Sequence, residues 1–349
     1  MPTLADFDLF DLQQQFAAWG FKPSHALPVL RRYYAQGGEF DPGDLLLPRG
    51  MLRRIEEAAT PDACSVAVRQ VAEDGTTKIL LKLKDGRTVE SVLMPDFHRE
   101  RAAGCISSQV GCAMGCDFCA TTKTGFERNL TAGEMVEQFL VLRREALNTG
   151  RQLRTIVFMG MGEPMLNLSN VLDTVHRIAG NDLGALGWRQ ITVSTVGIVP
   201  GIEALTAANL NIHLAVSLHA PDDLTRAQIL PTGKRFGVQE IMAAADRYQA
   251  TTGRIVTVQY CLLKGVNDTL EQARQLAHLM AARRMHVNLL RYNPTGLSLR
   301  GVIYERSSDE TADAFMGELR ARGIIAHFRR SRGKDIDAAC GQLRRRAAV

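Results

Sequence analysis

The spacing of hydrophobic residues divides the chain into three regions. Over the first sixty residues apolar side chains recur at helical spacing, as in DFDLFDLQQQFAAWG, and this pattern ends at Gly20. Two further helices are predicted over about 24–36 and 49–58. A small helical bundle that packs on a larger domain is sufficient to explain this region.

From residue 64 to residue 94 the hydrophobic period is two, which indicates strands. The segments CSVAVRQVAEDG, TTKILLKLKDG and RTVESVLMP predict a β-meander, with turns at the Asp-Gly pairs 74–75 and 85–86. Cys64 is interpreted as a small apolar residue of the first strand. The residues alone favour an exposed strand carboxylate for Glu90, in the third strand.

Strand and helix patterns alternate from about residue 102 to residue 330. Helices are predicted over 131–145, 238–250 and 270–284, and Thr131 and Glu134 form a capping-box pattern at the start of the first. Alternation predicts an α/β fold with a parallel sheet, and in a partial barrel functional groups collect at the C-terminal strand ends. The predicted strands lie near 102–109, 155–159, 190–195, 212–217, 255–262, 286–292 and 324–330.

Length and composition favour two regions. A chain of 349 residues exceeds the usual single-domain size unless it forms a barrel, and its 46% hydrophobic residues can bury a sizeable core. We therefore predict a helical and β-meander region over 1–95 and a larger barrel with a C-terminal tail over 96–349. The division is expected near 95–101.

Charge and apolar content exclude some classes of protein. The net charge of +5 and the pI near 8.9 are compatible with RNA binding, but many proteins of this charge bind no nucleic acid. The first fifty residues are net acidic, whereas the last thirty contain a cluster of arginines. No stretch approaches eighteen apolar residues, so no membrane span is predicted. The N-terminus lacks the basic segment of a secretory signal, and a cytoplasmic location is expected.

Three of the seven cysteines form a C-x₃-C-x₂-C array at Cys112, Cys116 and Cys119. Three thiolates at this spacing can bind three corners of a cubane iron–sulfur cluster and leave the fourth iron without a protein ligand. An open metal position is typical of a site that performs chemistry. The alternatives are a zinc knuckle that lacks its fourth ligand and a chance arrangement. No His or Cys in the next forty residues completes a zinc site, and the cluster argues for a reducing compartment.

Short polar motifs follow several of the predicted strands. Each has a simple structural explanation. A tight turn would explain the motif MGEPMLN, a strand-end serine such as Ser194 usually bonds to local backbone, and a lone histidine such as His219 is usually a core or loop residue. The residues concerned are Gly162 and Glu163 in MGEPMLN, Ser194 in VSTVG, Ser217, Leu218 and His219 in AVSLHAP, and Asn293 in NLLRYNPTG.

The C-terminal segment RRSRGKDIDAACGQLRRR combines a cysteine with many cations. Cys340 is flanked by Ala and Gly, which give an accessible backbone that suits a nucleophile. Cys105, seven residues before the first cysteine of the array, has the simpler interpretation of a buried strand residue. A solvated basic terminus would look like a phosphate-binding one. The cations are Arg329, Arg330, Arg332, Lys334, Arg344, Arg345 and Arg346.

The array and its setting, CISSQVGCAMGCDFCATTKTGF, resemble those of radical S-adenosylmethionine (SAM) enzymes and, among them, the RlmN/Cfr family of RNA adenosine methyltransferases. The resemblance runs from about residue 89 to residue 343 and is poor over the first sixty residues. It implies a partial (β/α) barrel and one 4Fe-4S cluster bound by the three cysteines and SAM. Two SAM molecules are implied per turnover.

The resemblance also implies roles for single residues. The seven strand-end residues from Gly162 to Asn293 match SAM-binding positions of the family. Cys340 matches the cysteine that carries the methyl group, Cys105 matches a second catalytic cysteine, and Glu90 matches the proton acceptor. Arg291 stands where the family usually has proline, so the loop after it departs from the family pattern.

The chemistry implied by the resemblance begins with transfer of a methyl group from one SAM to Cys340. A radical from a second SAM activates this methyl group for addition to an adenine ring carbon, and Cys105 assists release through a transient disulfide. The implied substrate is 23S rRNA, with tRNA as a second candidate and with a role for the N-terminal region in RNA contact. An electron donor such as flavodoxin or ferredoxin is expected, with a monomeric protein and no membrane partner.

Alternatives remain at this stage. Carbon 2 of adenine is preferred over carbon 8, although both branches of the family share these motifs. A radical SAM enzyme that acts on another substrate is a second alternative. A non-catalytic, metal-containing RNA-binding module is a third, and a zinc content without iron or sulfide would favour it.

Overall fold

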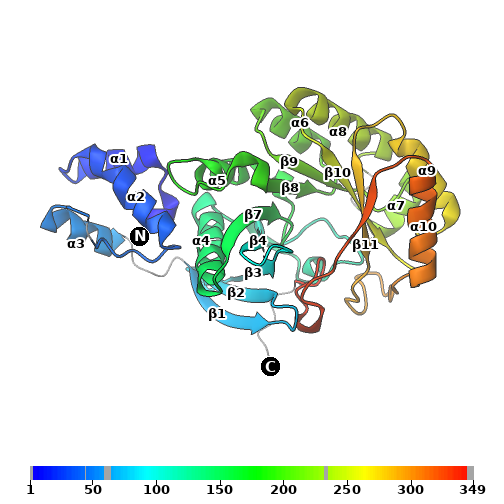
Figure 1. Ribbon diagram of the computed structural model, residues 1–349, viewed down its shortest axis with the longest axis horizontal. Helices are drawn as coiled ribbons and strands as arrows, with labels where there is room; N and C mark the ends of the chain where they lie inside the picture. The colour runs from blue at the N-terminus through cyan, green and yellow to red at the C-terminus, as the bar shows by residue number, and fades with distance from the viewer. Residues whose placement is uncertain (1–2, 44, 59–63, 232–234, 344–349) are drawn as a thin grey trace.

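The computed structural model describes residues 3–43, 45–58, 64–231 and 235–343. A ten-stranded sheet runs through most of this chain, in the order β1-β2-β3-β4-β7-β8-β9-β10-β11-β12 (Figure 1). Its strands are β1 (Cys64–Val71), β2 (Thr77–Leu83), β3 (Thr88–Pro95), β4 (Arg101–Cys105), β7 (Gln152–Phe158), β8 (Ile191–Thr195), β9 (His213–Ser217), β10 (Val256–Leu262), β11 (His286–Arg291) and β12 (Ala326–Arg329).

The type of strand pairing changes once across this sheet, at β4. Strands β1 to β4 pair antiparallel, whereas every pair from β4–β7 to β11–β12 is parallel. The parallel part is the predicted barrel, and the antiparallel part is the predicted meander, with Cys64 buried in its first strand. Both predictions are confirmed.

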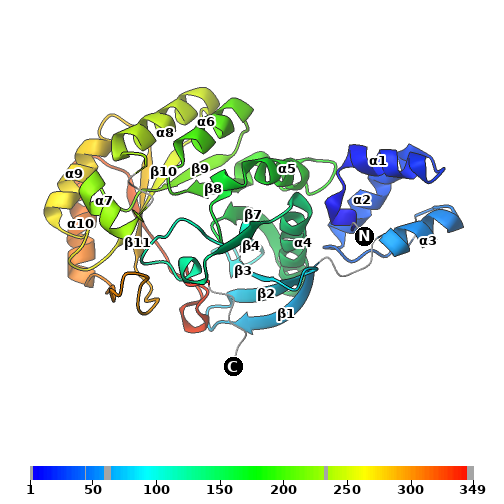
Figure 2. The same ribbon diagram turned by 180° about the vertical axis from the view of Figure 1, so that it is seen from behind.

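Helices cover the outside of the curved parallel sheet (Figures 1 and 2). The predicted helix at 131–145 is α4, which begins with the predicted capping box at Thr131 and Glu134. These helices are α4 (Ala132–Asn148), α5 (Leu168–Ala179), α6 (Val199–Ala208), α7 (Asp223–Ile229), α8 (Val238–Thr252), α9 (Leu270–Met280) and α10 (Asp309–Ala321). None of the described helices is long and apolar enough to cross a membrane.

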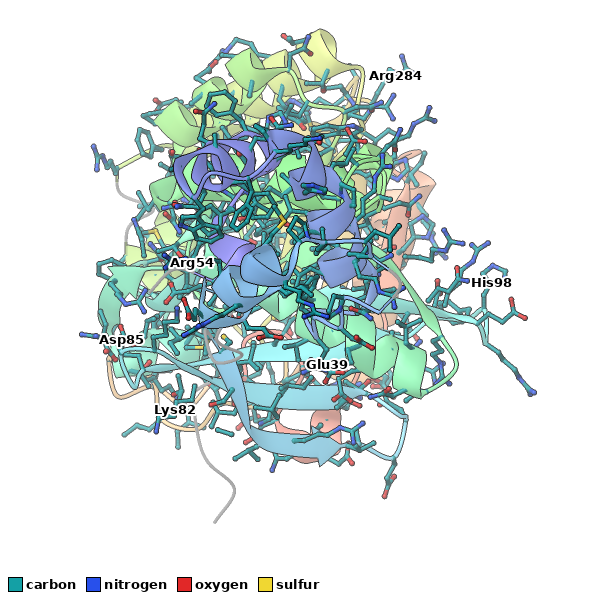
Figure 3. The ribbon with its side chains drawn as sticks, turned by 90° about the vertical axis from the view of Figure 1, so that its left-hand side faces the viewer. Glu39, Arg54, Lys82, Asp85, His98 and Arg284 are labelled. Atoms are coloured by element: carbon teal, nitrogen blue, oxygen red, sulfur yellow. The ribbon has the colours of Figure 1, made fainter. Side chains whose placement is uncertain are left out.

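The N-terminal helices α1 (Leu9–Ala18), α2 (Ala26–Ala35) and α3 (Arg49–Ala58) lie at one end of the molecule, as the helical spacing predicted (Figures 1 and 3). Polar contacts join this N-terminal region to α4 and to the loop after α5. Thr3 Oγ1 lies 3.2 Å from Glu137 Oε1 of α4, and Arg31 forms a 2.6 Å ion pair with Asp182.

Two boundaries differ by four residues from the sequence-based expectation. The strand expected over 102–109 ends at Cys105, and a short β5 (Gln109–Gly111) pairs instead with β6 (Phe126–Asn129) in a separate sheet. The break arises because Gln138 of α4 binds the backbone N–H of Ser107, which withdraws this residue from the strand ladder. Helix α9 ends at Met280, because the chain enters the left-handed region at Ala282 with φ 64°.

The proposed division of the chain near 95–101 falls within a continuous sheet. Strands β3 and β4, on its two sides, are paired by four residues, from Val92 opposite Cys105 to Pro95 opposite Ala102. The two regions therefore share one hydrogen-bonded sheet, and the division stays a prediction.

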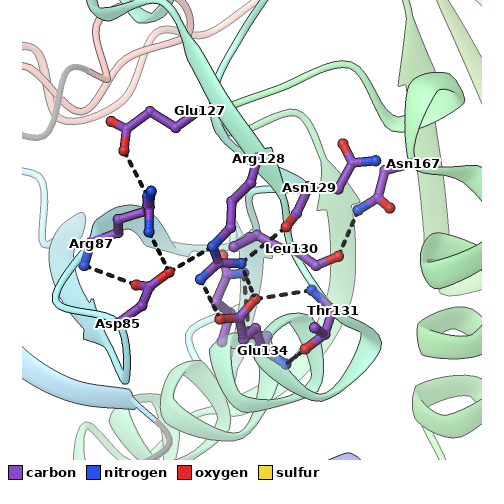
Figure 4. A network of polar contacts seen from close by, with 10 residues as sticks. Asp85, Arg87, Glu127, Arg128, Asn129, Leu130, Thr131, Glu134 and Asn167 are labelled. Atoms are coloured by element: carbon purple, nitrogen blue, oxygen red, sulfur yellow. Dashed lines mark hydrogen bonds and ion pairs between the residues drawn. The ribbon is translucent and has the colours of Figure 1, made fainter.

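A network of ion pairs joins the meander to the start of α4 (Figure 4). Arg128 of β6 donates to Asp85 of the β2–β3 turn at 2.7 Å and to both carboxylate oxygens of Glu134 at 2.7 and 2.8 Å. Glu134 also accepts from the backbone N–H of Thr131 at 2.9 Å. One capping residue thus fixes the helix end and the adjoining turn together.

Thr131→Ala is expected to lower the free energy of unfolding by about 1 kcal/mol, because the N–H of Glu134 loses its side-chain acceptor. Urea unfolding followed by circular dichroism measures this loss. Thr251→Ala, at an exposed position of α8, is the matched control and should change stability by less than about 0.5 kcal/mol. Equal losses in the two variants would contradict the capping role.

Candidate functional site

Two adjoining cavities lie at the C-terminal ends of the parallel strands. The first has an empty volume of about 970 Å³, counted out to open solvent. It is lined by the loops that follow β7, β8 and β9 and by the C-terminal segment. The residues singled out from sequence that line it are Cys112, Cys116, Cys119, Gly162, Glu163, Ser194, Ser217, His219, Arg329 and Cys340.

The three cysteines of the array lie on the loop between β5 and a short 3₁₀ turn at Thr121–Thr124. The loop is narrow at its base, where Gly111 has φ +77° and a Cβ atom would lie 1.7 Å from the carbonyl oxygen of Gly125. Only glycine fits at this position. The loop then turns back so that Cys112, Cys116 and Cys119 face the same cavity.

A second segment covers the outer side of this loop. The buried carboxylate of Asp117, between two of the cysteines, accepts a 2.9 Å hydrogen bond from the hydroxyl of Tyr304 and a 3.2 Å bond from the N–H of Arg300. The guanidinium of Arg300 also donates to the carbonyl of Gln228 at 2.8 Å. The chain after β11 therefore fixes the cysteine loop from outside.

The donor chemistry of the three cysteines fits an iron–sulfur cluster. Burial raises the pKa of all three thiols, that of Cys112 to about 12. A bound metal reverses this effect, because a coordinating cation stabilises the thiolate. Within the described residues no three His, Cys, Asp or Glu side chains are arranged around a single ion, whereas a cubane meets three thiolates through three different irons.

Glu163 links the loops after β7 and β8. Its carboxylate accepts from the N–H of Val196 at 2.8 Å and of Met165 at 3.1 Å, and its own N–H donates to Gln109 at 2.8 Å. The approach of Gln109 requires Gly162, at which φ is +101° and a Cβ atom would lie 2.6 Å from Gln109 Cβ. Burial raises the pKa of Glu163 to about 7.

The ends of β8 and β9 bring two serines together. Ser194 Oγ and Ser217 Oγ are 3.4 Å apart, and both line the first cavity. Leu218 differs from its neighbours, because its side chain is fully buried in the core and does not line the cavity. Its backbone N–H donates to Gln259 at 3.1 Å. Contact of Leu218 with a ligand would therefore involve its backbone.

His219 is held neutral beside the cysteine loop. Its Nδ1 accepts from the N–H of Cys261 at 3.0 Å, which places the proton on Nε2. Burial and the charge of Arg226 lower the pKa of His219 to about 3. Its ring packs edge-on against Phe118, with 5.0 Å between ring centroids. The histidine therefore positions the loop and presents a donor to the cavity.

The second cavity contains the two remaining cysteines of interest. It is lined by Cys105 at the end of β4 and by Cys340, and it shares Cys119, Arg329 and Cys340 with the first cavity. Burial raises the pKa of Cys105 to about 12, the nearby Cys340 adds to this rise, and Arg329 opposes it. All seven cysteines are free in the structure, so a transient disulfide between Cys105 and Cys340 stays a prediction.

Asn293 and the C-terminal cations lie around this second cavity. Asn293 lines it together with Arg329, Arg330 and Arg332, whereas Glu163 and the two serines line the first. Arg329 differs from the expected surface cation, because its guanidinium enters the cavity and contacts the sulfur of Met159 at 2.9 Å. Lys334 is exposed, and the expected cations at 344–346 lie outside the described residues.

The interpretation of Glu90 as an exposed strand carboxylate is wrong. Glu90 is only 1% exposed, and one carboxylate oxygen lies 3.6 Å from Nζ of Lys78 on β2. It lines neither cavity. The C-terminal segment covers this face of the meander, and a strand pattern contains no information on a cover that comes from a distant part of the chain.

Two functional positions were not identified from sequence. Arg226 of α7 is 2% exposed and donates to the carbonyls of Leu218 and Val196, so it ties together the loops after β9 and β8. Lys78 is 7% exposed. In TTKILLKL two lysines interrupt an apolar strand, but this pattern does not distinguish the buried Lys78 from the exposed Lys82, and Arg226 gave no signal of its own.

Comparison with known proteins agrees with this architecture. The profile of the Radical SAM superfamily matches residues 106–279. A probable dual-specificity RNA methyltransferase RlmN 1 of Opitutus terrae is 66% identical over 98% of this chain and 97% of its own length. A dual-specificity RNA methyltransferase RlmN of Syntrophobacter fumaroxidans is 39% identical over 97% of this chain and 96% of its own.

A solved structure is similar over the same extent. The crystal structure of a radical SAM methyltransferase from Sphaerobacter thermophilus covers 99% of this chain and all of its own, with a TM-score of 0.93 and 40% identity. The fold, the strand-end cavities and near full-length similarity to named relatives lead to one assignment. The chain belongs to the RlmN family of radical SAM RNA methyltransferases.

Proposed function

We propose that this protein methylates a ring carbon of adenine, carbon 2 in preference to carbon 8, in 23S rRNA and with tRNA as a second substrate. The methyl group is carried by Cys340. The observation that carries this proposal is that Cys340 lines both cavities, with the cysteine array on one side and Cys105 on the other. The names of the relatives, dual-specificity RNA methyltransferases, support RNA as the substrate.

Cys112, Cys116 and Cys119 would hold a 4Fe-4S cluster, which supplies the electron that cleaves SAM. The buried position of the loop, fixed through Asp117 and His219, keeps water away from this chemistry. The electron donor is a carrier such as flavodoxin or ferredoxin.

The strand-end residues would position SAM. Glu163 is assigned to the amino group, because it is a buried carboxylate between two strand ends. Gly162, Ser194, Ser217, His219 and the backbone at Leu218 complete this set around the first cavity. Asn293 is assigned to the boundary with the second cavity, which it lines with Cys340.

In the proposed reaction the sulfur of Cys340 accepts a methyl group and later presents it to the base. The methyl carbon loses one hydrogen atom to the radical derived from the second SAM before it bonds to the ring carbon. Cys105 then attacks the sulfur of Cys340 as a thiolate, and the bond between that sulfur and the transferred carbon breaks. Its electron pair goes to the carbon, which takes up a proton, while the two sulfurs form a transient disulfide that a thiol reductant reduces before the next turnover. Glu90 is assigned as the acceptor of the proton that leaves the ring carbon. Arg330, Arg332 and Lys334 rim the second cavity or lie beside it and are suited to RNA phosphates.

Mass spectrometry of RNA treated with anaerobically reconstituted protein tests the proposal as a whole. Adenosine with the new methyl group on carbon 2 is the expected product. A methyl group on carbon 8 would assign the protein to the branch of the family that methylates carbon 8. Absence of methyl groups from RNA would favour a radical SAM enzyme with another substrate.

The Cys112→Ala/Cys116→Ala/Cys119→Ala variant should bind no iron–sulfur cluster and cleave no SAM, because its three ligands are lost. Iron and sulfide analysis and low-temperature EPR after reduction measure this. Cys261→Ala, which replaces a buried thiol of the same cavity, is the control and should retain the cluster. Iron and sulfide at wild-type levels in the triple variant would refute the ligand assignment.

Glu163→Gln should weaken SAM binding by about tenfold or more at pH 8, because an ion pair with the amino group is lost. The pKa of Glu163 near 7 means that its carboxylate is present above pH 7 and is lost below it. Wild-type affinity for SAM should therefore fall as pH drops through 7, whereas the variant should show little change. Equilibrium binding of SAM measures this, and loss of RNA affinity with normal SAM affinity would reverse the assignment.

The Cys340→Ala and Cys105→Ala variants should fail at different steps. Cys340→Ala should lose the methyl mark on this residue and all RNA methylation. Cys105→Ala should form the bond to RNA without release, so enzyme joined covalently to RNA should accumulate and be absent from the double variant. Intact-protein mass spectrometry and denaturing gels measure these species. Methylated RNA from Cys340→Ala at the wild-type rate would refute the mechanism.

A further inference from the structure

The segment that carries Cys340 is held from two sides. On one side the cysteine loop binds it, because the N–H of Ala120 donates to the carbonyl of Gly341 at 2.7 Å and Thr121 Oγ1 donates to the carbonyl of Leu343 at 2.8 Å. On the other side it lies against the β-meander (Figures 1 and 2). The contacts on this second side have no role in the chemistry proposed above.

The turn between β1 and β2 binds the start of the segment directly. Asp335 Oδ2 accepts from the N–H of Glu73 at 3.0 Å, and Asp74 Oδ2 accepts from the N–H of Gly333 at 3.2 Å. The fit is close, because a Cβ atom on Gly333 would lie 2.9 Å from Thr76 Cγ2, and its φ of +59° also favours glycine.

Lys78 makes the deepest contact between the meander and this segment. Its side chain is 9% exposed, and Nζ lies 3.5 Å from the carbonyl of Asp337 and 3.6 Å from the carboxylate of Glu90. Burial of an ammonium group is costly unless it is paired and hydrogen-bonded. While the segment covers Lys78, the contacts with Asp337 and Glu90 together offset this cost.

Strand register explains how Lys78 reaches both groups. Lys78 lies opposite Val92 on β3, and Val92 lies opposite Cys105 on β4. Residues directly opposite share one face, as do residues two apart on a strand. Lys78, Glu90 and Cys105 therefore point to the same face, which the C-terminal segment covers.

We propose that the β1–β2 turn and Lys78 form a latch that holds the Cys340 segment at the mouth of the barrel, with Lys78 as the positioning residue that connects the segment to Glu90. This inference rests on the proposed function, which gives Cys340 and Glu90 their roles. The latch keeps Ala338, Ala339, Gln342 and Leu343 buried while Cys340 itself is exposed. It thus gives the meander a function in methyl transfer.

Hydrogen–deuterium exchange on the full-length, cluster-loaded protein tests the latch without RNA or turnover. In Lys78→Met and in Asp74→Ala, peptides within 333–343 should exchange at least tenfold faster than in the wild type, while the barrel strands are unchanged. Lys82→Met is the matched control, because Lys82 lies on the same strand but is exposed (Figure 3), and it should behave as the wild type. Lys78→Arg retains a cation and should recover most of the protection.

Methyl loading of Cys340, measured by peptide mass spectrometry after incubation with SAM, should fall at least fivefold in Lys78→Met and stay normal in Lys82→Met. If Lys78→Met loosens the whole protein, Asp74→Ala decides, because it removes the interactions of the turn with Gly333 and Arg332 of the segment and, apart from these, a local bond to Thr76. Wild-type exchange of 333–343 in Asp74→Ala and Lys78→Met would overturn the latch. A wild-type protein that methylates no RNA would overturn the proposed function and leave the latch standing.

Discussion

The contact between the cysteine loop and the C-terminal segment is the interaction on which the site depends. Two bonds to backbone carbonyls, from Ala120 to Gly341 and from Thr121 to Leu343, bring residues more than two hundred positions apart into one wall. They join the loop that follows β5 to the last part of the described chain. They hold the Cys340 end of this segment against the cysteine loop, where Cys340 lines both cavities.

Buried polar side chains hold the rest of the wall. The carboxylate of Glu163 accepts from the N–H of Val196, and the guanidinium of Arg226 donates to the carbonyl of the same residue. Arg226 also donates to the carbonyl of Leu218. Such groups are costly to bury unless they are satisfied, so they restrict the loops to one arrangement. A cavity for a charged cofactor needs this rigidity, because its dipoles must be oriented before the ligand enters.

Local sequence patterns predicted the helices and strands. The features that these patterns missed depend on contacts between distant segments of the chain. Helix α3 has the bounds that its spacing indicated, and the strands of the barrel begin and end within three residues of expectation, except at β4. There, Gln138 of α4 ends the strand early. Glu90 was expected to be exposed and is buried, and its partner Lys78 contacts the carbonyl of Asp337, about 250 residues later. No periodicity encodes such a contact.

Cys105 and Cys340, which both line the second cavity, differ in access, and this difference limits the order in which they can react. Cys340 is exposed, so a large substrate can approach its sulfur. Cys105 is 7% exposed at the end of β4, and burial keeps it protonated at neutral pH. A nucleic acid cannot reach the buried thiol of Cys105. Cys340 can reach it, because Cys340 lines the same cavity. The geometry therefore suits a cycle in which Cys340 meets the substrate first and Cys105 acts only on Cys340, with Arg329 as the charge that favours its thiolate.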